Sequence, residues 1–327
     1  MPRCASTLCL ALAVPLAAQD PAGWLDPSPH RVEFVTVEKE VRLEVLDWGG
    51  SGTPLVLLAG GGNTAHVFDD FAPKLTAGHH VLAITRRGFG ASGFSLPANV
   101  LQRLRDDVLA VMDAQKLVRP VLIGHSIAGA ELSSIASRHP ERIAGLVYIE
   151  AGYPYAFDNG KGPSMQEFLQ LAGPQAPDPG ASALADFPSL QRWDEHVYGF
   201  RMPEAEFRQT WDSGPGDTPV RPRAFPGSQL LMAVISATTR PKEIPVPALV
   251  LFAVPHVPEN WMKAPAVQDA ARAYFRKIDA LSRRQADALE AAVPTAHVVR
   301  RRGMHYLFLS NGPEVLRQIQ AFLATLK

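Results

Sequence analysis

The apolar residues of this chain form short continuous runs that alternate with stretches of helical spacing. Continuous runs are typical of parallel strands buried on both faces, and they occupy residues 55–59, 80–84, 120–123, 143–149 and 248–253. Helical spacing occurs at residues 66–75, 101–114, 127–136, 265–292 and 313–326. Such alternation predicts βαβ units and a parallel sheet.

Three further strands and an insertion complete the pattern. Residues 31–37 and 41–47 alternate between apolar and polar positions and predict an antiparallel pair, and residues 296–300 predict a last strand. Between the apolar runs at 143–149 and 248–253, residues 152–243 are rich in Pro, Gly and Asp. They show short helical pieces and lack an evident strand period. We therefore predict a core at residues 20–151 and 244–327, interrupted by a helical insertion at 152–243, the lid segment.

The first 19 residues have the pattern of a signal peptide. A charged start is followed by an apolar stretch at residues 8–18 that ends in small residues. This predicts a secreted or periplasmic protein, and the apolar run is too short for a stable membrane span. Cys4 and Cys9 both lie in this leader, so the mature chain is expected to have neither a disulfide nor a thiol nucleophile.

Composition narrows the expected partners. Hydrophobic residues make up 46% of the 327 residues, which is enough for a large core. Lys+Arg and Asp+Glu are balanced at 32 each, which argues against a nucleic-acid partner. A small-molecule substrate is expected, and the oligomeric state is left open.

Candidate chemistry begins at Ser126, which lies where the strand at 120–123 passes into the helix at 127–136. A serine on a sharp strand-to-helix turn is the geometry of a nucleophile elbow, which needs small residues two positions before and after the serine. Gly124 and Ala128 meet that need. Because a serine hydroxyl is a weak nucleophile without a base, a histidine must lie within hydrogen-bonding reach.

Four motifs at strand ends resemble those of the α/β-hydrolase fold superfamily, across essentially all of the mature chain. They occupy residues 58–62, 87–92, 124–129 and 303–308. The resemblance implies an α/β fold with a mostly parallel eight-stranded sheet, helices on both faces and a helical lid insertion. It also implies the chain order serine, acid, histidine.

His305 is the expected base, since it follows the last strand and precedes the closing helix. For the acid, residues 145–151 resemble the segment from which some haloalkane dehalogenases supply theirs, which favours Glu150. Glu259 is the reserve candidate. Those enzymes use an aspartate nucleophile where this chain has Ser126, so dehalogenation and epoxide opening are disfavoured. His256, after the strand at 248–253, has a smaller claim by position.

Backbone amides of Gly61 and Ile127 are the expected oxyanion hole. Candidates for the substrate pocket are Gly62, His125, Tyr153 and Trp261; His125 sits where superfamily members commonly have a packing histidine. The many aromatic residues of the lid segment favour an apolar or aromatic substrate.

The sequence thus predicts an exported serine hydrolase of carboxylic esters that uses neither a metal nor a cofactor. A C–C bond hydrolase or a cofactor-free perhydrolase would use the same residues. A non-catalytic binding protein on the same scaffold is the remaining alternative.

Overall fold

The computed structural model describes residues 23–326, so the predicted signal peptide at residues 1–19 lies outside the described residues.

The centre of the fold is one eight-stranded sheet with the order β1-β2-β4-β3-β5-β6-β9-β10. The pairs β1–β2 and β2–β4 are antiparallel, and the other neighbours are parallel. The predicted mostly parallel eight-stranded sheet is therefore confirmed. The strands are β1 (Arg31–Glu38), β2 (Val41–Gly49), β3 (Thr53–Leu58), β4 (His79–Ile84), β5 (Val121–His125), β6 (Gly145–Ile149), β9 (Ala248–His256) and β10 (Ala296–Gly303).

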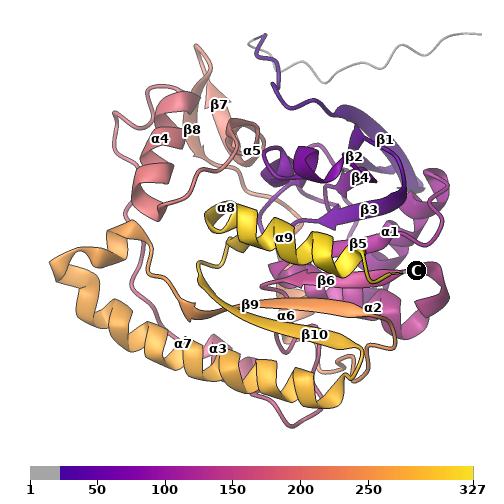
Figure 1. Ribbon diagram of the computed structural model, residues 1–327. Helices are drawn as coiled ribbons and strands as arrows, with labels where there is room; N and C mark the ends of the chain where they lie inside the picture. Colours follow the sequence, from indigo (N-terminus) through magenta and orange to yellow (C-terminus); the bar gives the residue numbers. More distant parts are fainter. Residues whose placement is uncertain (1–22, 327) are drawn as a thin grey trace, which may run out of the picture.

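Helices cover both faces of this sheet, and each face has its own apolar core. One face packs against α1 (Val100–Ala114), α2 (Gly129–Arg138), α6 (Ser228–Ser236) and α7 (Pro265–Ala292). The other packs against η1 (Ala65–Phe68), η2 (Ala72–Leu75), α8 (Leu307–Ser310) and α9 (Gly312–Leu323). Figure 1 shows α7 and α9 on opposite sides of β9 and β10. Three further short 3-10 turns are η3 (Ser126–Ala128), η4 (Pro140–Arg142) and η5 (Asn260–Lys263).

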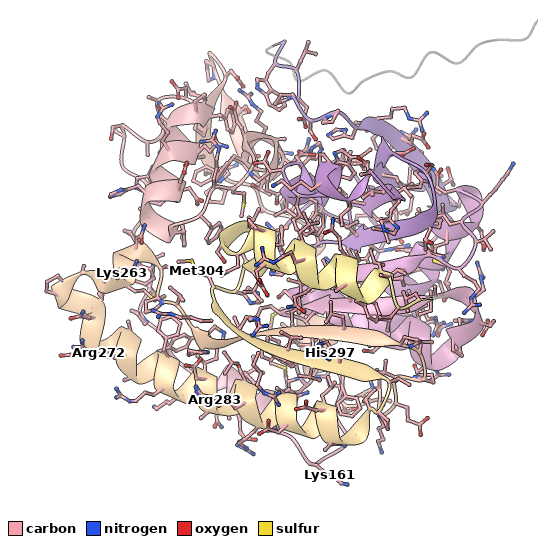
Figure 2. All side chains as sticks on the ribbon, viewed as in Figure 1. Lys161, Lys263, Arg272, Arg283, His297 and Met304 are labelled. Carbon is pink, nitrogen blue, oxygen red and sulfur yellow. The ribbon has the colours of Figure 1, made fainter. Side chains whose placement is uncertain are left out.

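The longest helix, α7, presents a polar side to solvent. Arg272 and Arg283 have half-exposed side chains on this outer side (Figure 2). In residues 23–326, no helix combines the length and the apolar character that crossing a membrane requires.

The helix predicted at residues 66–75 is wrong, because the chain there makes two separate 3-10 turns, η1 and η2. Pro73 lies within η2, and proline has no N–H to continue a helical ladder and disfavours helical backbone at the residue before it. The side chain of Thr64 caps η1 by accepting a hydrogen bond from the His66 amide.

The lid segment contains a β-hairpin that the sequence analysis did not predict. Strands β7 (Trp211–Gly214) and β8 (Thr218–Pro222) are antiparallel, with Gly216 and Asp217 at φ +71° and +58° in the turn. The strands are only 4 and 5 residues long and contain two prolines, so they show little apolar alternation. The segment also carries α3 (Met165–Leu169), α4 (Phe187–Tyr198), α5 (Glu204–Thr210) and α6.

These elements do not lie together. Helices α4 and α5 share a small apolar cluster of Phe187, Leu190 and Phe207, next to the hairpin (Figure 1). In contrast, α3 packs against α7, and α6 packs against α1. Only part of the lid segment is thus grouped around α4 and α5, and its role as a lid stays a prediction.

Candidate active site

Ser126 lies in the strained turn between β5 and α2. Its φ is +53°, in a left-handed region that costs a non-glycine residue about 1–3 kcal/mol. A Cβ at Gly124 would approach a methyl of Leu132 to 2.8 Å and the Cβ of Ala128 to 3.1 Å. At Gly124 the need for a small residue therefore arises from the side chains of Ala128 in η3 and Leu132 in α2.

The structure brings Ser126, His305 and Glu150 together from three loops. His305 lies between β10 and α8, and its Nε2 is 3.0 Å from the Ser126 Oγ. Its Nδ1 is 3.2 Å from Oε2 of Glu150, which follows β6. The His305 side chain is 43% exposed, whereas that of Glu150 is completely buried. The imidazole thus connects the hydroxyl of half-buried Ser126 to a buried carboxylate.

Glu150 is held by several donors besides His305. Oε1 accepts from the Ala253 amide at 2.5 Å, and Oε2 accepts from the Tyr153 hydroxyl at 2.8 Å. Burial alone would raise the pKa of Glu150, but the hydrogen bonds and charges of His256 and His305 outweigh it and lower the pKa. The carboxylate is therefore ionised and fixed in place at neutral pH.

His256 lies behind Glu150 and extends this network to α7. Its Nε2 is 3.5 Å from Oε2 of Glu150, and its Nδ1 is 2.7 Å from Oδ1 of Asp279. The Asp279 oxygen also accepts from the backbone amide of His256 at 2.9 Å. Burial opposes the charged imidazole, but the two carboxylates raise the pKa of His256 to about 9. A charged imidazole at the end of β9 thus supports the carboxylate.

Glu259, the reserve acid, has another partner. Its Oε2 accepts from the Trp261 indole at 2.6 Å, so Trp261, a predicted pocket residue, binds Glu259. Burial raises the pKa of Glu259. Burial together with the charge of Glu259 raises the pKa of the neighbouring Asp194 to about 7. Of the two acids, Glu150 is the one in contact with His305.

Two predicted pocket residues lie beneath the site instead of on its surface. His125 is 1% exposed, and its Nε2 is 3.1 Å from the backbone oxygen of His305. Burial and the nearby charge of His305 lower the pKa of His125 to about 3, so it is a neutral packing residue, which corrects its expected place in the pocket. Tyr153 is 7% exposed and directs its hydroxyl at Glu150.

The glycine loop after β3 is shaped by a buried arginine. Arg86 donates to the carbonyl oxygens of Ala59 and Gly60, at 2.9 and 3.3 Å, and is itself paired with Glu131 at 2.6 Å. Since the Gly61 N–H belongs to the same trans peptide unit as the Gly60 carbonyl, it points away from Arg86. The arginine therefore fixes the direction of the amide that the sequence assigns to the oxyanion hole.

The far end of this loop is held by side chains from other elements. Asn63 donates to Oε1 of Glu206 on α5 at 2.9 Å and accepts from the Tyr306 hydroxyl at 2.9 Å. Gly62, exposed with φ +82°, has free space where a side chain would lie. A Cβ at Gly61 would lie 3.7 Å from a methyl of Ile127, so the two predicted oxyanion residues are neighbours.

Sequence reasoning missed several supporting residues of this site: Arg86, Glu131, Asn63, Glu206, Tyr306 and Asp279. Two of them had a positional signal. Asn63 directly follows the glycine run, and Tyr306 directly follows His305. The others reach the site from elements distant in the sequence, so their contacts depend on tertiary packing.

Aromatic side chains of the lid segment line a cavity of about 340 Å³. They include Trp193, Tyr198 and Trp211, with Asp194 beside them. None of the residues Ser126, Glu150 and His305 lines this cavity. These aromatics therefore shape a hollow of the lid segment itself.

The chain is similar to known proteins in sequence and in fold. Residues 55–318 match a family described as the alpha/beta hydrolase family. A pyrethroid hydrolase of Sphingobium wenxiniae is 32% identical over 183 residues, which cover 51% of this chain and 64% of that protein. A dihydrolipoyllysine-residue acetyltransferase component of the acetoin cleaving system of Pseudomonas putida is 33% identical over 169 residues, or 50% of this chain and 43% of that protein. The chain thus spans less than two thirds of either relative.

A solved structure of an E-2-(acetamidomethylene)succinate hydrolase superimposes with a TM-score of 0.61 at 16% identity. The match covers 90% of this chain and 100% of the other. At this identity the likeness is one of fold.

Proposed function

Because this chain belongs to the alpha/beta hydrolase family, we propose that it is a serine hydrolase that cleaves carboxylic esters through an acyl-enzyme. The observation that carries the proposal is the continuous contact from Ser126 Oγ through the His305 imidazole to Glu150, at 3.0 and 3.2 Å. These distances lie within the range in which a base can take a hydroxyl proton. The relative named a pyrethroid hydrolase supports hydrolysis as the reaction.

In the first step, His305 Nε2 takes the proton of the Ser126 hydroxyl as Oγ attacks the ester carbonyl carbon. Glu150 accepts the Nδ1–H of His305, which keeps Nε2 free as the base and stabilises the imidazolium. The negative charge on the former carbonyl oxygen is received by the amides of Gly61 and Ile127, each worth about 3 kcal/mol.

The collapse of this intermediate completes acylation. His305 gives its proton to the leaving alkoxide, and the acyl group stays on Ser126. A water molecule then loses its proton to His305 and attacks the acyl carbon. The bond between that carbon and Ser126 Oγ breaks, the carboxylic acid leaves, and the proton returned by His305 restores the Ser126 hydroxyl. The cycle needs only groups that the chain supplies and one water molecule.

We propose a small apolar or aromatic ester as the substrate. Support comes from the apolar side chains near the site: Ile127 lies beside Gly61, and a Cβ at Gly61 would lie 3.1 Å from a methyl of Leu231 on α6. An apolar surface next to the reacting carbonyl favours an uncharged acyl or alcohol group.

A panel of p-nitrophenyl and aryl esters of increasing chain length tests this function. We expect ester turnover by the wild type and its loss in Ser126→Ala, with an unchanged melting temperature. Assays for C–C bond cleavage and perhydrolysis run beside it. Activity in one of these assays alone, without ester turnover, would contradict the proposal, as would turnover by Ser126→Ala close to the wild-type rate.

We also propose export, on the pattern of residues 1–19. Sequencing the N-terminus of protein recovered from the producing cells tests it. We expect a start after residue 18 or 19, and retention of residues 1–18 would contradict export.

A further inference from the structure

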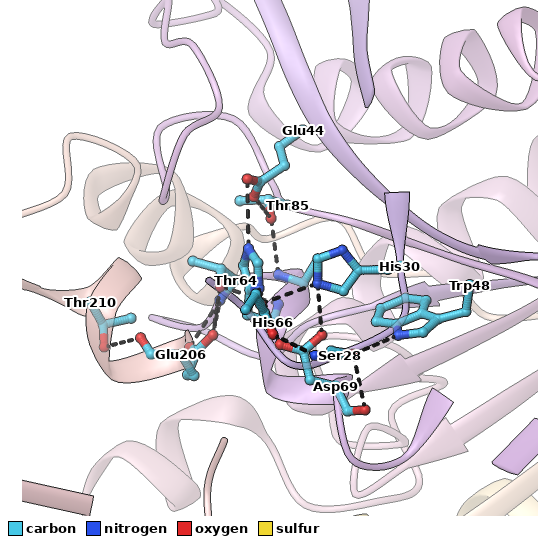
Figure 3. Close-up of polar contacts among 12 residues, drawn as sticks. Ser28, His30, Glu44, Trp48, Thr64, His66, Asp69, Thr85, Glu206 and Thr210 are labelled. Carbon is cyan, nitrogen blue, oxygen red and sulfur yellow. Dashed lines mark hydrogen bonds and ion pairs between the residues drawn. The ribbon is translucent and has the colours of Figure 1, made fainter. Parts of the chain in front are cut away.

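A second group of histidines and carboxylates lies outside the candidate active site. It comprises Asp26 and His30, which precede β1, and His66 and Asp69, which lie in and just after η1. Nitrogen or oxygen atoms of all four lie within 4.8 Å of one another. We call these residues the four-residue cluster, and Figure 3 shows its contacts around His30, His66 and Asp69.

The four-residue cluster alternates nitrogen and oxygen atoms at short range. His30 Nε2 is 3.2 Å from an oxygen of Asp26 and 3.2 Å from an oxygen of Asp69. His66 Nδ1 is 3.0 Å from Asp26 and 3.1 Å from Asp69. Each imidazole thus directs one nitrogen at both carboxylates.

We propose that the four-residue cluster is a structural zinc site. Two imidazole nitrogens and two carboxylate oxygens are ligand types that Zn²⁺ accepts, at about 2.0–2.2 Å in a tetrahedron. Neighbouring ligands of such a tetrahedron are about 3.3–3.6 Å apart. The contacts of 3.0–3.2 Å are therefore only a few tenths of an ångström shorter than this spacing. They share Oδ2 of Asp26 but use both oxygens of Asp69, so the Asp69 carboxylate has to turn one oxygen towards both histidines to bind the ion.

An unpartnered oxygen supports a cation at this position. Asp69 is 5% exposed, and its Oδ1 is buried without a hydrogen-bond partner, although His30 Nε2 lies 3.2 Å away. A buried carboxylate oxygen without a donor is costly. A metal ion between Asp69 and His30 would satisfy this oxygen without requiring a donor hydrogen.

One group outside the cluster, next to His66, also suits a bound metal. A histidine ligand of a metal usually directs its second nitrogen at a carboxylate or carbonyl. The second nitrogen of His66, Nε2, lies 3.7 Å from Oε1 of buried Glu44, and Glu44 is held by the Thr85 hydroxyl at 2.6 Å. The acid is thus fixed on the outer side of His66.

The four-residue cluster is reached from the surface. A cavity of about 410 Å³ is lined by Asp26 and Asp69, among others. Ser126, Glu150 and His305 do not line it, so an ion entering here would not meet the reacting groups. With four protein ligands the zinc shell is closed, which is the arrangement of structural sites.

Zinc binding would join the segment before β1 to the core of the fold. Asp26 and His30 would be joined to η1, and the residue that caps η1, Thr64, donates its amide and hydroxyl hydrogens to Glu206 of α5. This proposal departs from the expectation that the protein uses no metal. Neither His30 nor His66 stood out in the sequence, because the two pairs of ligands lie far apart along the chain.

Metal analysis of the purified full chain tests the site. We expect about one zinc ion per chain by mass spectrometry. Removal by dipicolinate should lower the melting temperature by roughly 5 °C or more, and added Zn²⁺ should restore it. Co²⁺ in place of zinc should give the visible absorption bands of a tetrahedral site. A wild-type chain without zinc, whose melting temperature responds neither to dipicolinate nor to added Zn²⁺, would show instead that the cluster is an ion-pair network and would overturn the proposal.

Variants locate the ion. Asp69→Asn and His30→Gln should each lower the zinc content of folded protein at least about tenfold. The matched control is His80→Gln, which breaks another histidine–aspartate pair, His80 with Asp47 at 2.9 Å, and should keep the zinc. Equal zinc content in all three variants would place the ion elsewhere and contradict the assignment.

Discussion

The candidate active site and the four-residue cluster use the same two kinds of side chain in different surroundings. His305 is 43% exposed and contacts one carboxylate on one side and a hydroxyl on the other. His30 and His66 are 3% and 6% exposed, and each lies between two carboxylates. An imidazole that is open on one side can pass a proton to a substrate, whereas one enclosed by two carboxylates has no open side to present to a substrate. Burial and the number of carboxylates therefore separate a site suited to proton transfer from one suited to an ion.

Removing the negative charge of Glu150 should have the largest effect on the candidate active site. Glu150→Gln should lower kcat for ester hydrolysis by about 10³–10⁴-fold, because an amide no longer stabilises the imidazolium of His305. Steady-state kinetics on a p-nitrophenyl ester measure this. Glu259→Gln is the matched control and should stay within about threefold of the wild type. If only the control loses activity, Glu150 is not the acid.

Replacing His256, which lies behind Glu150, should lower kcat less than replacing Glu150 itself. His256→Gln should lower kcat by about tenfold with little change in KM, since His256 holds Glu150 and does not reach Ser126. A change in KM alone would assign His256 to substrate binding instead.

His256 should also make stability depend on pH. The pKa of His256 is raised from 6.5 to about 9 in the folded chain, so its contribution is complete below about pH 6.5 and is lost as the pH rises through about 9. Denaturant unfolding should show a wild-type advantage over His256→Gln that shrinks by up to about 3 kcal/mol across this range. A difference that stays constant with pH would mean that the His256 charge contributes nothing to folding.

The smallest expected effect comes from one hydrogen bond. Tyr153→Phe removes the hydroxyl that donates to Glu150 and leaves the ring in place. Hydrogen bonds to charged groups contribute about 1.5–3 kcal/mol, so the free energy of unfolding should fall by that amount. Activity should fall only a few-fold, because His305 and His256 still hold the acid. A loss as large as that of Glu150→Gln would give Tyr153 a direct part in the reaction.

Periodicity and turn chemistry predicted the sheet and the turn at Ser126 because both are local properties. The run at residues 55–59 and the small residues around Ser126 are visible in the sequence. The choice of Glu150 came from the resemblance of residues 145–151 to the acid-bearing segment of some haloalkane dehalogenases. Contacts between distant elements were not predictable in this way. Arg86 beneath the glycine loop, Asp279 behind His256 and the pairing of His30 with His66 all depend on how the elements pack.

Labelling with a serine-reactive phosphonate tests the central claim, that the His305 imidazole activates the Ser126 hydroxyl, most directly. Peptide mass spectrometry of the labelled wild type should place the adduct on Ser126, and His305→Ala, folded by its melting curve, should label at least about 10³-fold more slowly. An adduct on another residue, or labelling of His305→Ala at the wild-type rate, would contradict the account.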